Sequence, residues 1–164
     1  MARSKIKHFK GFSIVDGDIR VTLNMSRFER QFQRAQYQLD GAVMNSMVPF
    51  MPMVTGSFIN ATRAASAAAQ GSGEVYAAYG PQGRFLYEGK TMVDEKTGST
   101  WARRGAKKVL VSEFGRKTNA KPDLTYTRQA HPKAQSHWFD AAKKADGKKW
   151  IMDVKKTAGG GQRG

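Results

Sequence analysis

The chain has 164 residues, enough for one domain with its own core, and 28 lysine and arginine residues outnumber 13 aspartate and glutamate residues. Its net charge of +15 at pH 7 implies attraction to nucleic acid, an acidic protein surface or anionic lipid. There is no cysteine, which excludes disulfides and leaves the redox compartment open, although an intracellular origin fits. No apolar run approaches the ~20 residues that cross a bilayer, so no membrane partner is expected. Because no apolar signal segment follows the basic N-terminus, synthesis in the cytosol is expected.

The N-terminal part predicts a hairpin followed by a long helix. Residues 12–23 carry the turn signal Asp16-Gly17 between two apolar arms. Residues 26–47 are the clearest helix, with Ser26 and Glu29 at capping-box spacing and an expected end before Pro49. Apolar residues recur there at steps of three or four and predict one stripe that packs on the core. They are Phe28, Phe32, Ala35, Leu39, Val43 and Met47.

The rest of the chain predicts shorter elements. An alanine-rich helix is expected to start at Thr55 or Ser57 and to run through Ala69, until Gly71-Ser72-Gly73 breaks it. A final helix is expected from residue 136 to about residue 154. Strands are expected at residues 75–79, 109–112 and 124–127, with either a strand or a helix at 84–87.

Two segments are expected to lack regular structure. Residues 90–108 are polar and mixed in charge and predict a long loop, which in a compact domain is usually functional or disordered. Residues 158–164 are rich in glycine and predict a flexible tail. We therefore expect a single domain over residues 1–157, with both the loop and the chain beyond Val154 mobile until assembly orders them.

The positive charge is not evenly spread. Six lysines lie between residues 143 and 156, and a second cluster falls in the predicted loop beside a tryptophan. Trp and Arg are the residue types that most often dominate protein interfaces, so this second cluster supplies the interface candidates. They are Trp101, Arg103, Arg104, Lys107 and Lys108. The same cluster also suits a nucleic-acid surface, with cations on phosphates and an aromatic ring stacked on bases.

No set of residues points to catalysis, a metal or another cofactor. Gly89-Lys90-Thr91 resembles the end of a phosphate-binding loop, but the glycine required five positions before Gly89 is Arg84. His131, His137 and Asp140 are too few for a closed metal site, which needs about four ligands. We therefore expect a protein that is not an enzyme.

A series of short motifs in fixed order resembles the tailed-phage minor capsid proteins that join head to tail, also called head–tail connector or tail-completion proteins. It covers roughly residues 45–155. The motifs are Pro49-Phe50 with Gly56; Gly71 to Tyr76; Tyr87, Gly89 and Lys90; Met92-Val93-Asp94; Trp101-Ala102-Arg103; Gly105 to Lys108; His131-Pro132; and Ser136, Trp138-Phe139, Ala142-Lys143 and Trp150. One departure is Gly80-Pro81-Gln82-Gly83-Arg84, where these proteins often carry Pro-Tyr-Ala-Arg.

The resemblance implies a small α+β fold, which we expect as a small antiparallel sheet packed by the long N-terminal helix and the C-terminal helix, with a long loop. It implies a structural virion protein of the phage neck, found in the host cytoplasm during assembly. The implied partners are copies of itself in a ring, expected to be a hexamer, the head-completion or adaptor protein of the portal complex, the tail-tube protein, and genomic DNA in the lumen. The alternative is a basic nucleic-acid-binding module.

Overall fold

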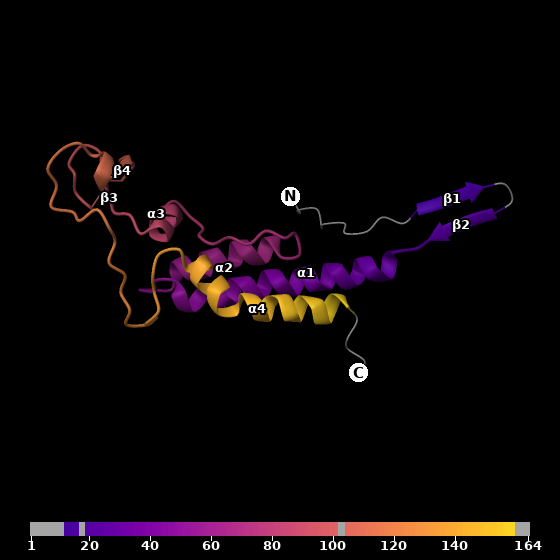
Figure 1. Ribbon diagram of the computed structural model, residues 1–164. Helices are drawn as coiled ribbons and strands as arrows, with labels where there is room; N and C mark the ends of the chain where they lie inside the picture. Colours follow the sequence, from indigo (N-terminus) through magenta and orange to yellow (C-terminus); the bar gives the residue numbers. More distant parts are fainter. Residues whose placement is uncertain (1–11, 17–18, 102–103, 160–164) are drawn as a thin grey trace. The chain divides into compact units, whose positions relative to one another are not determined.

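The computed structural model describes residues 12–16, 19–101 and 104–159, and it has the α+β class that the sequence predicts (Figure 1). Its helices are α1 (Ser26–Met47), α2 (Ser57–Ala69), α3 (Gly83–Glu88) and α4 (Trp138–Ala158). Its strands are β1 (Phe12–Asp16), β2 (Ile19–Leu23), β3 (Met92–Asp94) and β4 (Lys108–Leu110). They form two separate antiparallel pairs, β1 with β2 and β3 with β4.

The chain divides into two compact units, each assembled from separate stretches of sequence. The first unit contains Met1–Ser46, Arg63–Tyr76 and Ala142–Gly164. The second unit contains Met47–Thr62 and Ala77–Ala141. The single domain expected over residues 1–157 stays a prediction.

The hairpin and the long helix of the first unit lie where the sequence predicts them. In the hairpin, Phe12 faces Leu23 and Asp16 faces Ile19. Helix α1 spans Ser26–Met47, but the predicted capping box is wrong, because Ser26 is the first residue of the helix and Met25 occupies the N-cap position. The Glu29 backbone N–H donates to the Met25 carbonyl (2.9 Å), so hydrogen bonding begins at Met25 and not at Ser26. The Asn24 side chain accepts from the Ser26 N–H (2.9 Å) and satisfies this otherwise unpaired donor.

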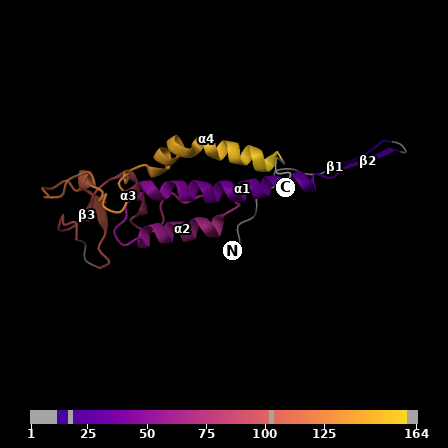
Figure 2. The same ribbon diagram turned by 90° about the horizontal axis from the view of Figure 1, so that it is seen from below.

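The apolar stripe of α1 is buried at Ala35 and further along the helix, but not at its start. Val43 and Met47 are buried, whereas Phe28 is 48% exposed, which corrects the expectation that the whole stripe faces the core. Figure 2 shows α1 between α4 and α2. Gln70, the residue after α2, donates from its Nε2 to the Tyr37 carbonyl (2.9 Å). From α4, Thr157 Oγ1 donates to Gln38 (2.7 Å) and Trp150 Nε1 donates to Ser46 (3.2 Å). The first turns of α1 extend past these contacts.

A buried carboxylate closes the turn after α2. Asp40 on α1 is 4% exposed. Its Oδ2 accepts from the backbone N–H groups of Gly71 (2.7 Å) and Gly73 (3.1 Å), and its Oδ1 accepts from Gln36 Nε2 (2.7 Å). Hydrogen bonds to a charged acceptor are roughly twice as strong as neutral ones. Asp40 therefore fixes the glycine turn against α1.

Trp138, at the start of α4, is the largest fully buried side chain of the second unit, with 0% exposure. Its indole Nε1 donates to the Ala77 carbonyl (2.7 Å). The ring meets Tyr87 and Phe58 edge-on, at centroid distances of 4.9 and 5.9 Å. This geometry suits the aromatic quadrupole and adds to the area that the ring buries.

Three predicted strands are wrong or displaced. Residues 75–79 are irregular, because hydroxyl groups of α2 take their backbone bonds: Ser66 bonds Tyr76, and Thr62 accepts from the Tyr79 N–H (3.2 Å). The strand expected at 109–112 is β4 at Lys108–Leu110, followed by a 3-10 turn at Val111–Glu113. Residues 124–127 form no strand, and the neighbouring Asp123 makes a single bridge with Lys90.

Two further predictions concern the segment at residues 84–87 and the C-terminal end of the last helix. Residues 84–87 belong to a helix, α3, and not to a strand. Helix α4 continues through Ala158, so the tail expected from residue 158 is helical at its first residue, and residues 160–164 lie outside the described part. Among the described residues, no helix combines the length and apolar character needed to cross a membrane.

Two tyrosines of the second unit predict a loss of stability in alkali. Burial raises the pKa of Tyr126, whose hydroxyl donates to the Leu86 carbonyl. The pKa of Tyr87 is also raised, mainly by burial and then by the negative charges of Asp140 and Glu88. A raised pKa in the folded state means that this stability is complete below the unfolded pKa of about 10 and falls as pH rises above it. Urea titrations from pH 8 to 11 should show a smaller alkaline loss for Tyr126→Phe than for the wild type. An equal loss would mean that Tyr126 does not contribute.

Candidate interaction surface

The interface candidates gather on the connection between β3 and β4 in the second unit. Trp101 is 89% exposed. Arg104, Lys107 and Lys108, which follow it in the chain, are exposed as well. Arg103 lies outside the described residues. The structure thus places the four described candidates at solvent, as a surface for partners requires.

Asp94 builds the base of this connection. It is 1% exposed, and its Oδ1 accepts from the N–H groups of Lys96 (2.8 Å) and Thr97 (3.1 Å). Its own N–H donates to the Ser99 carbonyl, and its carbonyl accepts from the Gly98 N–H, each at 2.8 Å. An aspartate side chain that bonds the backbone two and three residues later is a standard way to fix a turn. Asp94 therefore holds residues 94–99 in one compact turn.

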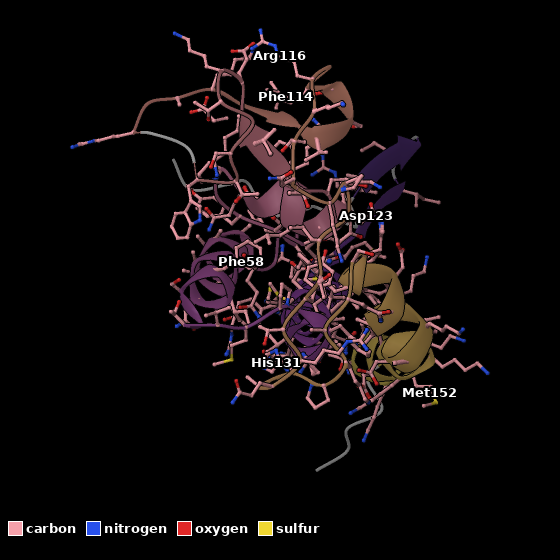
Figure 3. All side chains as sticks on the ribbon, turned by 90° about the vertical axis from the view of Figure 1, so that its left-hand side faces the viewer. Phe58, Phe114, Arg116, Asp123, His131 and Met152 are labelled. Atoms are coloured by element: carbon pink, nitrogen blue, oxygen red, sulfur yellow. The ribbon has the colours of Figure 1, made fainter. Side chains whose placement is uncertain are left out.

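Packing supports the same turn from outside. Gly98 has φ of 69°, and a Cβ there would lie 2.5 Å from Cε1 of Phe114, so only glycine fits. Thr118 Oγ1 donates to the Gly98 carbonyl (2.7 Å). The Arg116 guanidinium lies 6.0 Å from the centre of the Phe114 ring, and both are labelled in Figure 3. The exposed Trp101 follows three residues after this anchored glycine.

The predicted loop at residues 90–108 is therefore more ordered than the sequence suggests. It contains β3 and the Asp94 turn, and the Lys107 carbonyl accepts from the Glu95 N–H (3.1 Å). The sequence missed these because the bonds of Asp94 depend on the turn conformation, which polar composition does not reveal.

We predict slow amide exchange at two positions of this turn in the isolated protein. The N–H groups of Asp94 and Gly98 are hydrogen-bonded, whereas the Arg104 N–H has no bond among the described residues. Amides exchange only when such bonds open, so Asp94 and Gly98 should exchange at least tenfold more slowly than Arg104. Amide-resolved hydrogen exchange measures this difference. Equally fast exchange at all three would restore the expectation of a mobile loop.

The cations of the surface fall into two groups. Lys107 Nζ lies 3.3 Å from Glu95, and Lys90 Nζ lies 2.7 Å from Asp123, both at exposed positions. Arg104 and Lys108 have no ion pair among the described residues. Exposed pairs contribute only about 0–1 kcal/mol, so even the paired lysines remain available to a partner.

The structure separates the other candidate groups. His131 Nδ1 lies 2.8 Å from the Met51 carbonyl, whereas His137 lies 3.6 Å from Glu88 and 3.9 Å from Asp140. Within the described ranges, no group of three or more histidine and acidic side chains is arranged to hold a metal ion. The six lysines at residues 143–156 are exposed on α4 in the first unit.

One feature that the sequence did not single out is a groove of about 510 Å³ beside β4. Arg84 and Phe85 of α3 form part of its wall, about 20 residues before the cluster at Trp101. Only the fold brings α3 to β4, so sequence spacing carries no signal for it. Comparison of the chain with protein-family models, with curated protein sequences and with solved structures found no match.

Proposed function

We propose that the chain is a structural protein of a tailed-phage neck that joins the head portal or adaptor complex to the tail tube. In this proposal, copies of the chain form a ring around the DNA channel and contact the head-completion protein and the tail-tube protein. The supporting sequence observation is the ordered series of motifs from Pro49 to Trp150. The structural observation that carries the proposal is Trp101, 89% exposed on an anchored connection and next in the described chain to Arg104.

An exposed tryptophan in this setting favours a protein partner. A tryptophan buries about 150–250 Å² when covered, which at about 25 cal/mol per Å² corresponds to roughly 4–6 kcal/mol before the entropy cost of association. The Asp94 turn fixes the chain through Gly98 and Ser99, and Trp101 follows three residues after Gly98, so less order remains to be gained on binding. Preorganised anchors of this kind increase affinity by lowering that cost.

The alternative is a nucleic-acid-binding module. Arg104 and Lys108, which follow Trp101 in the chain and have no ion pair within the described part, favour it. The two functions differ in salt dependence. If phosphate contacts dominate, the logarithm of affinity for duplex DNA falls with the logarithm of salt concentration, with a slope of about −0.9 per phosphate neutralised. The neck function predicts weak DNA binding that is lost by physiological salt.

Location in the particle tests the proposal directly. Virions of the phage that encodes the chain should carry it at one place, the junction of head and tail, when labelled with specific antibody and viewed by electron microscopy. Protein absent from purified virions but bound to DNA in infected cells would contradict the neck function and support the alternative.

A further inference from the structure

The β3–β4 pair leaves one edge of β4 open. The Glu95 N–H bonds the Lys107 carbonyl, and the Val111 N–H bonds the Thr91 carbonyl, so residues 107, 109 and 111 turn their backbone groups toward β3. In an antiparallel pair the residues between these turn theirs away. The N–H and C=O of Lys108 and the N–H of Leu110 therefore face outward.

These three outward groups have no partner among the described residues. The Leu110 carbonyl is different, because Leu110 is the N-cap of the 3-10 turn at Val111–Glu113. The corresponding edge of β3 is closed, since the backbone of Asp94 bonds Gly98 and Ser99. The open groups of β4 can thus accept one added strand, and an unpaired strand edge is a ready template for one.

All three residues of β4 line the groove of about 510 Å³, including Lys108 and Leu110, which carry the open backbone groups. Its size is within the roughly 300–1,000 Å³ of protein pockets that enclose ligands. Phe85, Val109 and Leu110 contribute half-buried apolar side chains to its lining. The remaining lining residues are Arg84, Glu88, Lys90, Lys107, Lys108 and Glu113, four cations against two carboxylates.

We propose that this groove binds an extended, acidic segment of a partner protein, which adds as a strand to the open edge of β4. Backbone bonds to Lys108 and Leu110 supply pairing, and side chains at alternate positions of the segment point either to the apolar lining or to the cations. The excess of cations selects glutamate and aspartate. The inference stands on this groove alone and does not depend on the neck function.

A polypeptide explains the groove better than a nucleic acid does. Phosphates would satisfy Arg84 and Lys108, but the outward Lys108 carbonyl is an acceptor that phosphate oxygens cannot bond. A peptide strand supplies the N–H donor for that carbonyl and acceptors for both N–H groups. Glu88 and Glu113 in the lining would also repel a polyanion, whereas a strand of alternating sequence can turn apolar side chains toward them.

The probe is a fluorescein-labelled peptide of about seven residues that alternates glutamate and valine, measured by fluorescence anisotropy with the full chain. The matched peptide with lysine in place of glutamate tests charge. Two further peptides carry N-methyl groups on alternate residues, one on the odd and one on the even positions. A strand uses the N–H groups of only one edge, so one methylated peptide should bind like the parent and the other should lose at least tenfold in affinity.

Leu110→Pro tests the protein side. Leu110 has φ of −64°, which proline adopts without strain, and its N–H points away from β3, so the pair with β3 keeps its bonds. The proline ring occupies the place of the outward N–H and should reduce peptide affinity at least tenfold. Leu110→Ala, which removes the side chain but keeps the N–H, is the matched control and should lose much less.

The outcomes are distinct. Strand addition is supported if only one of the two methylated peptides loses affinity, and if Leu110→Pro loses more affinity for the parent peptide than Leu110→Ala does. If Leu110→Pro fails to fold, the comparison of the two methylated peptides decides alone. Equal binding of both methylated peptides would reduce the groove to a charged surface and overturn the proposal. The proposal would also be overturned if the acidic peptide did not bind. The same holds if a short DNA duplex bound more tightly than the peptide and displaced it at physiological salt.

Discussion

Trp138→Ala should lower the free energy of unfolding by about 3–5 kcal/mol, the usual cost of removing a buried aromatic side chain. Trp138 is 0% exposed, and its loss removes the ring contacts with Phe58 and Tyr87. It also leaves the Ala77 carbonyl without its donor. Because domains are typically stable by only about 5–15 kcal/mol, a large part of the stability would go. Urea unfolding followed by circular dichroism measures the difference.

Trp101→Ala is the matched control, since it deletes the same side chain from an 89% exposed position. Its effect on the free energy of unfolding should stay within about 0.5 kcal/mol, as is usual for surface substitutions. A small loss for Trp138→Ala, or equal losses for the two variants, would mean that the described packing around Trp138 is not the core of the second unit.

Asp40→Ala should cost roughly 2–4 kcal/mol, the second-largest effect that we expect. The buried carboxylate accepts from the N–H groups of Gly71 and Gly73, and bonds to a charged group contribute about 1.5–3 kcal/mol each. Without it, the buried Gly71 N–H loses its acceptor. The turn after α2 should open, which faster hydrogen exchange at Gly71 and Gly73 would report alongside the unfolding curve.

Asp40→Asn separates the hydrogen bonds from the side-chain volume. Asparagine keeps one acceptor oxygen for the glycine turn, and the amide of Gln36 can turn to meet its NH₂ group. It should therefore cost less than Asp40→Ala. If the two variants are equally stable, the charge of Asp40 matters and its bonding geometry does not.

The elements that follow from local sequence were predictable. Helix α1 has the predicted bounds, because its apolar spacing and the proline at position 49 act within the segment itself. The hairpin at residues 12–23 and the alanine-rich α2 were confirmed for the same reason. The start of α1 was predicted less well. The sequence favours Ser26 as the N-cap, but Met25 holds that position and the Asn24 side chain accepts from the Ser26 N–H.

Features that depend on distant partners were not predictable. Residues 75–79 have the β-branched and aromatic content of a strand, yet hydroxyl groups of Ser66 and Thr62 bind their backbone. The role of Asp40 needs a turn that lies 31 residues further along the chain. Phe28 fits the helical stripe but is 48% exposed, because burial of the stripe depends on what packs against α1 and not on its own spacing.

The candidate surface divides in the same way. Exposure of Trp101 and its basic neighbours follows from polarity around them, and the sequence located them. The sequence could not show that Asp94 orders the connection, nor that α3 brings Arg84 beside Lys108. The first depends on the conformation of the turn at residues 94–99. The second depends on the fold around β3 and β4, two strands of three residues whose pattern is too short to recognise.

The most direct test of the proposed neck function is a count of particles made by the encoding phage when its own copy of the chain carries Trp101→Ala. We predict a folded protein, normal DNA-filled heads and normal tails that remain separate in electron micrographs, because the anchor for the partner is missing. Wild-type numbers of joined virions from this variant would contradict the central claim.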